Sequence, residues 1–308
     1  MADSISKQAA EYWDENREKS SDPGFWMAHP LCREAINRRV TGSPDEWPLD
    51  WFRRVHAGEP FLRAVSFGCG LGAFERSAAR CGLALEIDAF DISARSLEQA
   101  RETASLEGHR CIAYRIGDFD DPRLRFQRYD VAFFHASLHH VSELERLFRR
   151  LAFTLKPNGA IYFDEFVGPS RDRWSEEKLA FAQNLLDLLP PEAKVRDKLV
   201  APIQADDPSE AVRSQEIPEF FHRFFEAVAW RPYGGQIVDL LFPCLDAQWL
   251  RSPAGHQTVL ALLAIEDGEL ERDPALSHHV VAYGRLKPAT GRWVGRRKAA
   301  GERRRTRR

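Results

Sequence analysis

Short runs of apolar residues alternate with amphipathic stretches from about residue 61 onward. The runs have the length of buried strands, and the stretches between them carry apolar residues at the spacing of a helix. This alternation is typical of a mostly parallel sheet covered by helices on both faces. The sequence therefore predicts an α/β protein. The first five expected strands are residues 61–67, 85–90, 111–115, 130–134 and 160–166.

Three helices are expected between these strands. The first covers 73–81 and can end at Gly82, and the second is capped by Ser93 and ends at Gly108. The third follows a cap at Ser142 and gives the strongest helical signal, because its apolar residues recur every three or four positions. These residues are Leu144, Leu147, Phe148, Leu151, Ala152 and Leu155. A Lys-Pro-Asn-Gly turn at 156–159 is expected before the fifth strand.

The regular alternation ends after residue 166. A leucine-rich helical segment stops at Pro190-Pro191, and a later helix is expected around residues 258–265. Two further segments can complete a seven-stranded sheet. These are strands six and seven, expected at 225–233 and 279–286. The expected layout is an N-terminal helical cap (1–55), a large α/β domain (56–290) and a disordered basic tail (291–308). Within the large domain, helical insertions are expected at about 169–221 and 236–276.

Composition excludes disorder of the whole chain, since 44% of the residues are hydrophobic and 29% are charged. The net charge of -2 hides a strong asymmetry. Nine Arg or Lys residues lie within 291–308 against the single acid Glu302, so the rest of the chain is acidic. The tail can contact an anionic membrane or nucleic acid weakly, whereas the acidic body would repel phosphates.

The five cysteines are scattered and lack the close pairs of a zinc site or a disulfide framework. A reducing cytoplasmic location is therefore expected. The first residues do not form a basic segment followed by an apolar one, and eighteen uncharged apolar residues nowhere run together. Neither secretion nor a transmembrane segment is expected.

A glycine-rich turn, Gly-Cys-Gly-Leu-Gly at residues 68–72, directly follows the first expected strand. Glycine has no Cβ, so a ligand can approach the backbone N–H groups and the amino terminus of the next helix. Gly68, Gly70 and Ala73 also satisfy the pattern of nicotinamide-binding enzymes, and Asp91 stands where a ribose-binding acid is expected. The turn therefore predicts a nucleotide-type cofactor without naming it.

Two further features favour S-adenosylmethionine over a nicotinamide. Gly72 adds a third glycine to the turn, and Gly117-Asp118-Phe119 follows the third expected strand. There a carboxylate can accept from the adenine amino group while the ring of Phe119 packs on the base. A P-loop is excluded because no Gly-Lys-Ser or Gly-Lys-Thr follows a glycine turn.

At these residues the sequence resembles the class I, Rossmann-like methyltransferases, with matches at 65–70, 88–93 and 129–140. The resemblance implies a Rossmann-like fold and S-adenosylmethionine as cofactor. The implied cofactor contacts are Phe67, Gly68, Cys69, Gly70, Gly72, Asp91, Ile92, Gly117, Asp118, Phe119, His135 and Ala136. Ser66 departs from the pattern, because many members carry an acid there. Backbone carbonyls or His135-Ala136 are therefore expected to anchor the methionyl ammonium.

Methyl transfer to a hydroxyl group needs an aligned acceptor and a base. His139 and His140, after strand four, and Glu165, at the end of strand five, are the candidate catalytic residues. Alternatively, one histidine packs beneath the next helix, and Glu165 pairs with Arg171 or Arg173. The sequence shows no tight group of metal ligands, and no metal is expected.

Three flanking segments, at 25–30, 165–171 and 231–235, resemble a bacterial subgroup associated with cell-surface polysaccharide biosynthesis. From these segments Trp26, His29 and Arg171 are expected to contact the acceptor, although aromatic residues such as Trp26 also serve as core. The predicted function is O-methylation of a saccharide or a small hydroxylated metabolite. Two alternatives stay open: an RNA methyltransferase tethered by the tail, and a cofactor-binding protein without catalysis.

Overall fold

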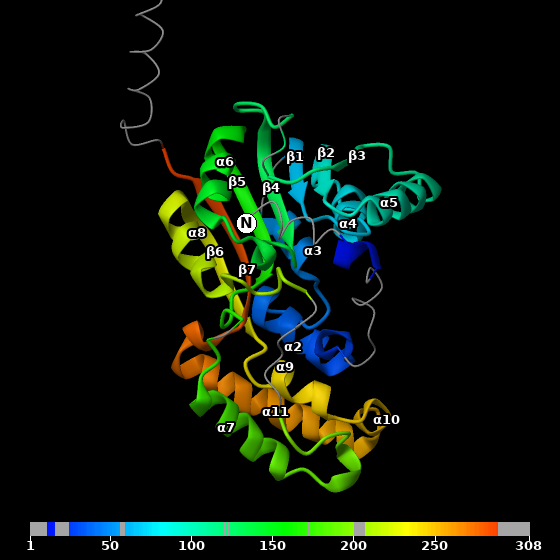
Figure 1. Cartoon of the computed structure of the whole chain (residues 1–308), viewed down its shortest axis with the longest axis vertical. Coiled ribbons are helices and arrows are strands. Elements are labelled where there is room, and N and C mark those ends of the chain that lie inside the picture. Colours follow the sequence, from blue (N-terminus) through cyan, green and yellow to red (C-terminus); the bar gives the residue numbers. More distant parts are fainter. Residues whose placement is uncertain are drawn as a thin grey trace, which may run out of the picture.

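The computed structural model describes residues 11–15, 25–55, 59–119, 121, 123–171, 173–199 and 207–288. In these residues one seven-stranded sheet has the order β3-β2-β1-β4-β5-β7-β6 (Figure 1). Only β7 runs antiparallel to its two neighbours, so the expected Rossmann-like, mostly parallel sheet is confirmed. The strands are β1 (Phe61–Phe67), β2 (Ala84–Asp91), β3 (Ile112–Ile116), β4 (Tyr129–His135), β5 (Leu155–Phe166), β6 (Phe225–Gly234) and β7 (His279–Leu286). The predicted tail, 291–308, lies outside the described residues.

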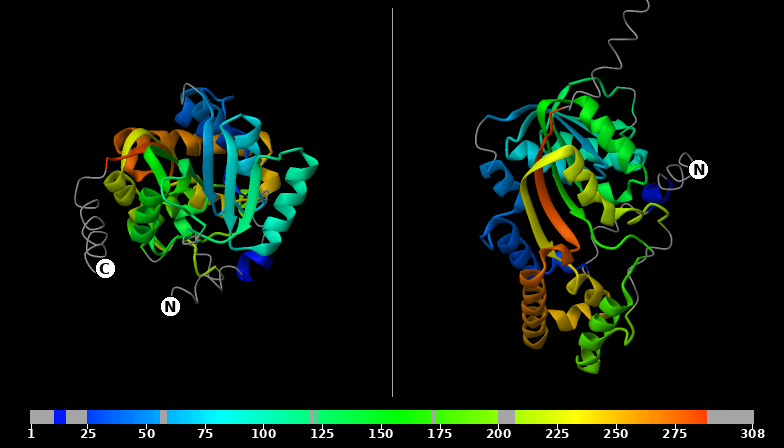
Figure 2. Two further views of the ribbon diagram at one scale, coloured as in Figure 1. Left: turned by 90° about the horizontal axis from the view of Figure 1, so that it is seen from above. Right: turned by 90° about the vertical axis from the view of Figure 1, so that its left-hand side faces the viewer.

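Helices cover both faces of the sheet, as Figure 2 shows from two sides. The alternation of side chains along β4 separates the two layers, because successive residues point to opposite faces. Val131 and Phe133 join the core with α3, α4 and α5, whereas Ala132 and Phe134 join the core with α6 and α8. The helices of these layers are α3 (Pro48–Val55), α4 (Ala73–Arg80), α5 (Ala94–Leu106), α6 (Leu144–Thr154) and α8 (Ile217–Phe224).

The N-terminal region differs from the cap expected for residues 1–55. Helix α3 covers a sheet face, because Phe52 inserts among aromatic rings of four strands and is fully buried. Its ring centroid lies 4.5 Å from that of Tyr162 and 4.9 Å from that of Tyr283. Helix α2 (Pro30–Thr41) packs against β6 and α11. Within the described part of the expected cap, residues 11–15 and Trp26 contact the carboxyl edge of the sheet.

Two insertions build a helical lobe beyond one edge of the sheet (Figure 1). One follows β5 and the other follows β6; these strands are parallel, so both insertions leave from the carboxyl edge. The insertions join where Lys194 pairs with Leu245 in a short β-bridge. The lobe contains α7 (Glu176–Asp187), α9 (Val238–Leu241), α10 (Ala247–Leu250) and α11 (Pro253–Arg272), with short 3-10 turns η4 (Pro191–Ala193), η6 (Phe242–Cys244) and η7 (Pro274–Leu276).

A buried ion pair fastens this lobe to the N-terminal region. Arg39 of α2 donates through Nη1 to Glu266 of α11 at 2.7 Å and to the carbonyl oxygen of Tyr233 at 2.9 Å. The other oxygen of Glu266 accepts from the backbone N–H groups of Gly235 and Ile237, each at 3.0 Å. The fully buried carboxylate thus joins α2, the end of β6 and α11.

Several boundaries differ from those expected. Strand β5 begins at Leu155 and includes the expected turn at 156–159, where Asn158 has a φ of 63°. Helix α6 follows Glu143, and Ser142 does not cap it; instead, the Ser142 carbonyl oxygen accepts a hydrogen bond from Arg213. Among the described residues, no helix is both long and apolar enough to cross a bilayer.

Phe52→Ala should lower the free energy of unfolding by about 3–5 kcal/mol, because it removes a fully buried ring and leaves a cavity between α3 and the sheet. Denaturation with urea measures this change. Phe126→Ala is the matched control, since 61% of that side chain is exposed, and a loss of less than about 1 kcal/mol is expected. Equal losses in the two variants would show that α3 does not stabilise the sheet.

Candidate functional site

The glycine turn between β1 and α4 is held tightly on two sides. Gly68, Gly70 and Gly72 have φ values of 66°, 49° and 73°, which other residues rarely adopt. A Cβ at Gly68 would lie 2.5 Å from the Cβ of Ser137, and one at Gly72 would collide with the ring of Tyr114. At Gly70, by contrast, a Cβ would meet nothing within 4 Å. The turn therefore packs against the ends of β3 and β4 and leaves Gly70 facing open space.

Asp91, the last residue of β2, connects this turn to α5. One of its carboxylate oxygens accepts from the backbone N–H of Gly70 at 2.7 Å, and the other accepts from Ser93 N–H at 2.8 Å. Burial raises the pKa of Asp91, while these two hydrogen bonds act in the opposite direction. Each oxygen keeps further lone pairs, so Asp91 can still accept hydrogen bonds from a ligand diol.

The remaining cofactor contacts implied by the sequence gather around Asp91 and the turn. Gly117 donates its N–H to the carbonyl oxygen of Asp91 at 2.9 Å, which places the half-buried Asp118 and Phe119 beside it. Half-buried Cys69 and Ile92 follow β1 and β2 directly. Phe67 is an exception, because its ring stacks on Phe90 and Phe134 in the core and only its backbone borders the turn.

His135 and Ala136 end β4 on the same edge. The ring of His135 stacks on Phe74 with centroids 5.3 Å apart, and its Nε2 lies 4.0 Å from Asp164. Ala136 adopts a φ of 49° and donates its N–H to the Asp164 carbonyl oxygen at 2.9 Å. Both residues thus lie between the glycine turn and the end of β5.

A carboxylate that sequence reasoning missed lies beneath the turn. Glu75 of α4 is buried, and its Oε1 accepts a hydrogen bond of 2.5 Å from the hydroxyl of Ser66. The other oxygen, Oε2, is buried and has no hydrogen-bond partner among the described residues. Burial raises the pKa of Glu75 to about 7. Glu75 therefore brings an acid to the position at which Ser66 departs from the methyltransferase pattern.

Glu165 organises the chain after β4. Its Oε1 accepts from the backbone N–H groups of Ser137 and Leu138, each at 2.6 Å, and its Oε2 accepts from His139 Nδ1 at 2.7 Å. The carboxylate is almost completely buried. Glu165 thus fixes the orientation of the His139 ring. The expected alternative partner, Arg171, instead donates to the carbonyl oxygens of Asp207 and Pro208.

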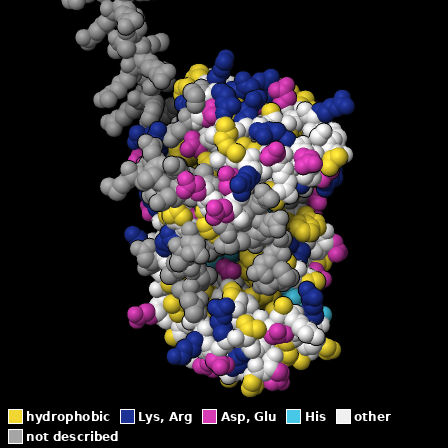
Figure 3. Space-filling model, turned by 45° about the vertical axis from the view of Figure 1, so that its right-hand side comes forward, with side chains coloured by type: hydrophobic (Ala, Val, Ile, Leu, Met, Phe, Trp, Pro, Cys, Tyr) yellow, Lys and Arg dark blue, Asp and Glu magenta, His cyan; other side chains and the backbone are white. Residues whose placement is uncertain are grey.

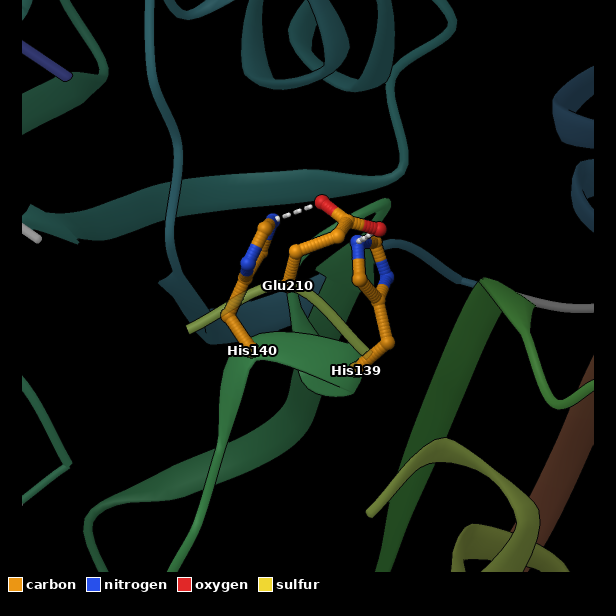
Figure 4. A group of neighbouring side chains, drawn as sticks. All are labelled: His139, His140 and Glu210. Carbon is orange, nitrogen blue, oxygen red and sulfur yellow. Dashed lines mark ion pairs between the residues drawn. The ribbon is translucent and has the colours of Figure 1, made fainter. Parts of the chain in front are cut away.

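His139 and His140 lie side by side in η3 (Leu138–His140), and their Nε2 atoms both face Glu210 (Figure 4). The separations from the Glu210 oxygens are 3.8 Å for His139 Nε2 and 4.0 Å for His140 Nε2, which are too long for hydrogen bonds. On the opposite side, His140 Nδ1 lies 3.1 Å from Ser209 Oγ and 3.7 Å from Asp207 Oδ2. Below, His139, His140 and Glu210 are called the histidine cluster.

The two histidines have pKa values that move in opposite directions. Burial alone would lower the pKa of His139, but the charges of Glu165, Glu210 and Asp207 and the hydrogen bond to Glu165 together raise it to about 9. Burial and the adjacent His139 hold the pKa of His140 well below its usual value. Around neutral pH, His139 is therefore cationic and His140 is neutral.

The helical residues 11–15 connect the two halves of the site. Trp13 makes an edge-to-face contact with His140 at 5.4 Å between centroids, and Asp14 accepts from the hydroxyl of Ser93 at 2.6 Å. This segment therefore reaches from the histidine cluster to the neighbourhood of Asp91. Figure 3 shows that the surface is hollowed between the sheet and the helical lobe, with acidic and histidine side chains visible in the hollow.

The three expected acceptor contacts are not brought together with the cluster. Trp26, in η2 (Trp26–Ala28), is only 1% exposed and packs on His279, so its ring belongs to the core. His29 packs among Phe242, His256 and Leu250 at the helical lobe. Arg171 holds the loop that carries Glu210, as described above.

Glu210 and Asp207 could not be assigned from the sequence, because a long insertion separates them from His139-His140. They precede the 3-10 turn η5 (Ser214–Glu216), in a loop with no repeating pattern. Glu75 did leave a signal. It lies three residues before Ala78 on the buried face of α4, where an acid is unusual.

Comparison with known proteins identifies one family model and several similar structures. Residues 65–163 match a family model described as a methyltransferase domain. No curated protein matches the chain. Among solved structures, the [4+2]-cyclase SpnF is similar, with a TM-score of 0.52 and 17% identity, over 91% of this chain and 96% of that one.

A second similar structure is phosphoethanolamine N-methyltransferase 2 of Haemonchus contortus in complex with S-adenosyl-L-methionine. Its TM-score is 0.53 at 15% identity, over 91% of this chain and 60% of that one. The present chain thus spans less than two thirds of the worm enzyme. At these identities both likenesses establish the shared fold alone, and one of the two proteins is described as a cyclase.

The raised pKa of Glu75 predicts a pH-dependent stability. In the folded protein this carboxyl stays protonated up to about pH 7, whereas in the unfolded chain it ionises near 4.5, the ordinary pKa of a glutamate. The folded state therefore loses stability as the pH rises from about 4.5 to 7, by about 3 kcal/mol in total. Glu75→Gln should remove this loss.

Urea denaturation at pH 5 and pH 8 tests this expectation. The free energy of unfolding of Glu75→Gln, relative to that of the unmodified protein, should be about 3 kcal/mol higher at pH 8 than at pH 5. Glu98→Gln, at an exposed position of α5, is the control and should show no such change. A difference independent of pH would mean that Glu75 is ionised in the folded protein.

Proposed function

We propose that this protein is an S-adenosylmethionine-dependent class I methyltransferase that methylates an oxygen atom of a small hydroxylated acceptor, of which a saccharide is one example. A single connection carries the proposal. Ser137 packs on Gly68 and donates its hydroxyl to Phe67 O, and its N–H binds Glu165, which orients His139. The cofactor turn and a cluster of proton-accepting groups are thus adjacent.

The cofactor half is supported by its resemblance to the family and by its own geometry. The match to a methyltransferase domain covers the turn, Asp91 and Gly117–Phe119. The worm methyltransferase, which shares the fold, was crystallised with S-adenosylmethionine. In the proposed complex Asp91 accepts from the ribose hydroxyls, and Asp118 with Phe119 holds the adenine. The negative charge of Asp91 favours a cofactor that carries a sulfonium and an ammonium group.

The acceptor half lies at the carboxyl ends of β4 and β5, where open α/β sheets bind their ligands. Methyl transfer to a hydroxyl group forms an O–CH3 bond and breaks the S–CH3 bond, and the hydroxyl proton must leave. Within the histidine cluster, the neutral His140 can accept this proton, and Glu165 is a positioning residue for His139. His140 contributes by packing beside His139, at 4.1 Å between ring centroids.

The negative charge at the carboxyl edge of the sheet argues against RNA, the alternative acceptor. Glu165, Asp207 and Glu210 surround His139 and His140, and Asp164 lies beside His135, so RNA phosphates would be repelled by these charges. A small neutral acceptor is therefore favoured over RNA. Incubation with methyl-labelled cofactor and separate fractions of metabolites, glycans and RNA tests this preference. Label in the RNA fraction alone would overturn it, and label in no fraction would favour a non-catalytic cofactor-binding protein.

Asp91→Ala should weaken the binding of S-adenosylmethionine by about 1–3 kcal/mol, since it leaves ribose hydroxyls without a buried acceptor. Isothermal titration calorimetry gives the dissociation constant. Asp45→Ala, which removes an exposed aspartate before α3, is the matched control and should bind like the unmodified protein. Unchanged affinity in Asp91→Ala would refute the assignment of the ribose site.

Glu165→Gln should lower kcat about 100-fold or more while the cofactor affinity stays nearly unchanged. The neutral amide no longer balances the charge of His139, and it can present a donor to His139 Nδ1 in place of the carboxylate oxygen. Steady-state kinetics with the best acceptor fraction measures kcat and KM separately. Glu145→Gln, a half-exposed position on α6, is the control. A loss confined to KM would remove Glu165 from this role.

A further inference from the structure

The side chains of the histidine cluster converge without bonding to one another. One ligand atom from each of His139, His140 and Glu210 lies within 4.8 Å of the others. In Figure 4 both imidazoles present Nε2 toward the same carboxylate, which approaches from the loop beyond η3. Since the nitrogen-to-oxygen separations are 3.8 Å and 4.0 Å, direct hydrogen bonds do not explain this arrangement.

Both imidazoles are fixed from behind by polar side chains. Glu165 holds Nδ1 of His139 at 2.7 Å, and Ser209 Oγ approaches Nδ1 of His140 to 3.1 Å. Metal-binding histidines characteristically have their second ring nitrogen held by a carboxylate or another polar group, which fixes the tautomer and aims the free nitrogen at the ion. The histidine cluster therefore has the outer partners of a metal site as well as the inner ligands.

A buried and unpartnered oxygen provides an independent sign that positive charge is needed here. Asp207 is completely buried, and its Oδ2 has no hydrogen-bond partner among the described residues. This atom lies 3.7 Å from His140 Nδ1. With Glu165 and Glu210, three carboxylates thus surround two imidazoles. Buried charges are stable in proteins only when they are paired or when they lie near a bound cation.

The spacing fits an ion of the first transition row after a small movement. Ligands at about 2.1 Å from a tetrahedral ion lie roughly 3.4 Å from one another, whereas the nitrogen-to-oxygen separations here are 3.8 Å and 4.0 Å and all three ligand atoms lie within 4.8 Å. Glu210 can move closer to both nitrogens, because its side chain is 19% exposed and belongs to a loop. Two imidazoles and one carboxylate suit Zn²⁺, Fe²⁺, Mn²⁺ or Co²⁺ and leave a coordination position open.

We propose that His139, His140 and Glu210 bind one divalent transition-metal ion through His139 Nε2, His140 Nε2 and a carboxylate oxygen of Glu210. The open position accepts the acceptor hydroxyl, and this role of the ion rests on the proposed methyltransferase function. The ion lowers the pKa of the bound hydroxyl, whose proton passes to bulk water. The oxygen then displaces the methyl group from sulfur, and neutral S-adenosylhomocysteine is the other product.

Metal binding is measured on the full chain after chelator treatment and dialysis. Calorimetry with Zn²⁺ should give one ion per chain, and Co²⁺ should produce visible absorption bands typical of a low-coordinate site. Glu210→Gln and His140→Ala should each lower Zn²⁺ affinity about 100-fold, and Glu165→Gln should lower it about 10-fold to 100-fold. His109→Ala is the matched control, because His109 pairs with Glu107 elsewhere on the protein.

Circular dichroism and the affinity for S-adenosylmethionine show whether each variant is folded. If His140→Ala does not fold, Glu210→Gln decides, because its side chain is partly exposed and its volume is unchanged. The proposal is overturned if the unmodified protein binds no stoichiometric ion. It is equally overturned if folded Glu210→Gln binds Zn²⁺ as tightly as the unmodified protein does.

The outcomes separate this proposal from the proposed function. Methyl transfer that proceeds at full rate in the presence of a chelator, with no ion bound, would leave the methyltransferase function intact and remove the metal. Stoichiometric Zn²⁺ binding that depends on Glu210, in a protein that binds no S-adenosylmethionine, would establish the metal site and refute the function.

Discussion

The candidate site at the carboxyl edge of the sheet depends on the hydrogen bonds of one buried carboxylate, that of Glu165. Its two oxygens act on different groups, one on the backbone after β4 and one on His139. Burying a carboxylate without hydrogen-bond partners would cost free energy of folding. The folded protein can therefore bury Glu165 only because these hydrogen bonds form. They also bring Ser137 against Gly68. The position of the glycine turn and the orientation of the imidazole are thus set by one side chain.

A second buried acid performs a similar task farther out. Glu266 binds Arg39 and the backbone that leaves β6, so the helical lobe has one arrangement relative to α2 and the sheet. Gly234 makes this contact possible, because a Cβ there would collide with both Glu266 and Arg39. Removing one partner would leave a buried charge uncompensated, which is more damaging than the loss of an exposed ion pair. The helical lobe is therefore joined to α2 and the end of β6 through a fully buried carboxylate.

The sheet and the cofactor side were predictable from the sequence, whereas the acceptor side was not. Strands β1 to β5, the glycine turn and Asp91 follow one another within about a hundred residues, so local periodicity and spacing suffice to place them. The sequence predicts an acceptor contact for Trp26, but its ring is buried in the core. The sequence cannot separate these two roles, because an aromatic residue is suited to either. Glu210 lies beside His139 only because the chain leaves the sheet after β5 and returns to it. The spacing of hydrophobic residues along the sequence does not predict such a long-range contact.

The distribution of charge explains how one edge can hold its substrates and then release them. Asp91 lies on the cofactor side, and Glu165, Asp207 and Glu210 lie on the acceptor side. In the proposed reaction the cofactor arrives with a sulfonium charge that these acids attract. Transfer of the methyl group removes that charge, so the attraction to the product is weaker at the same distances. An acidic edge thus favours binding of the donor over retention of the spent cofactor, and the same acids require a cation near the acceptor oxygen when its proton leaves.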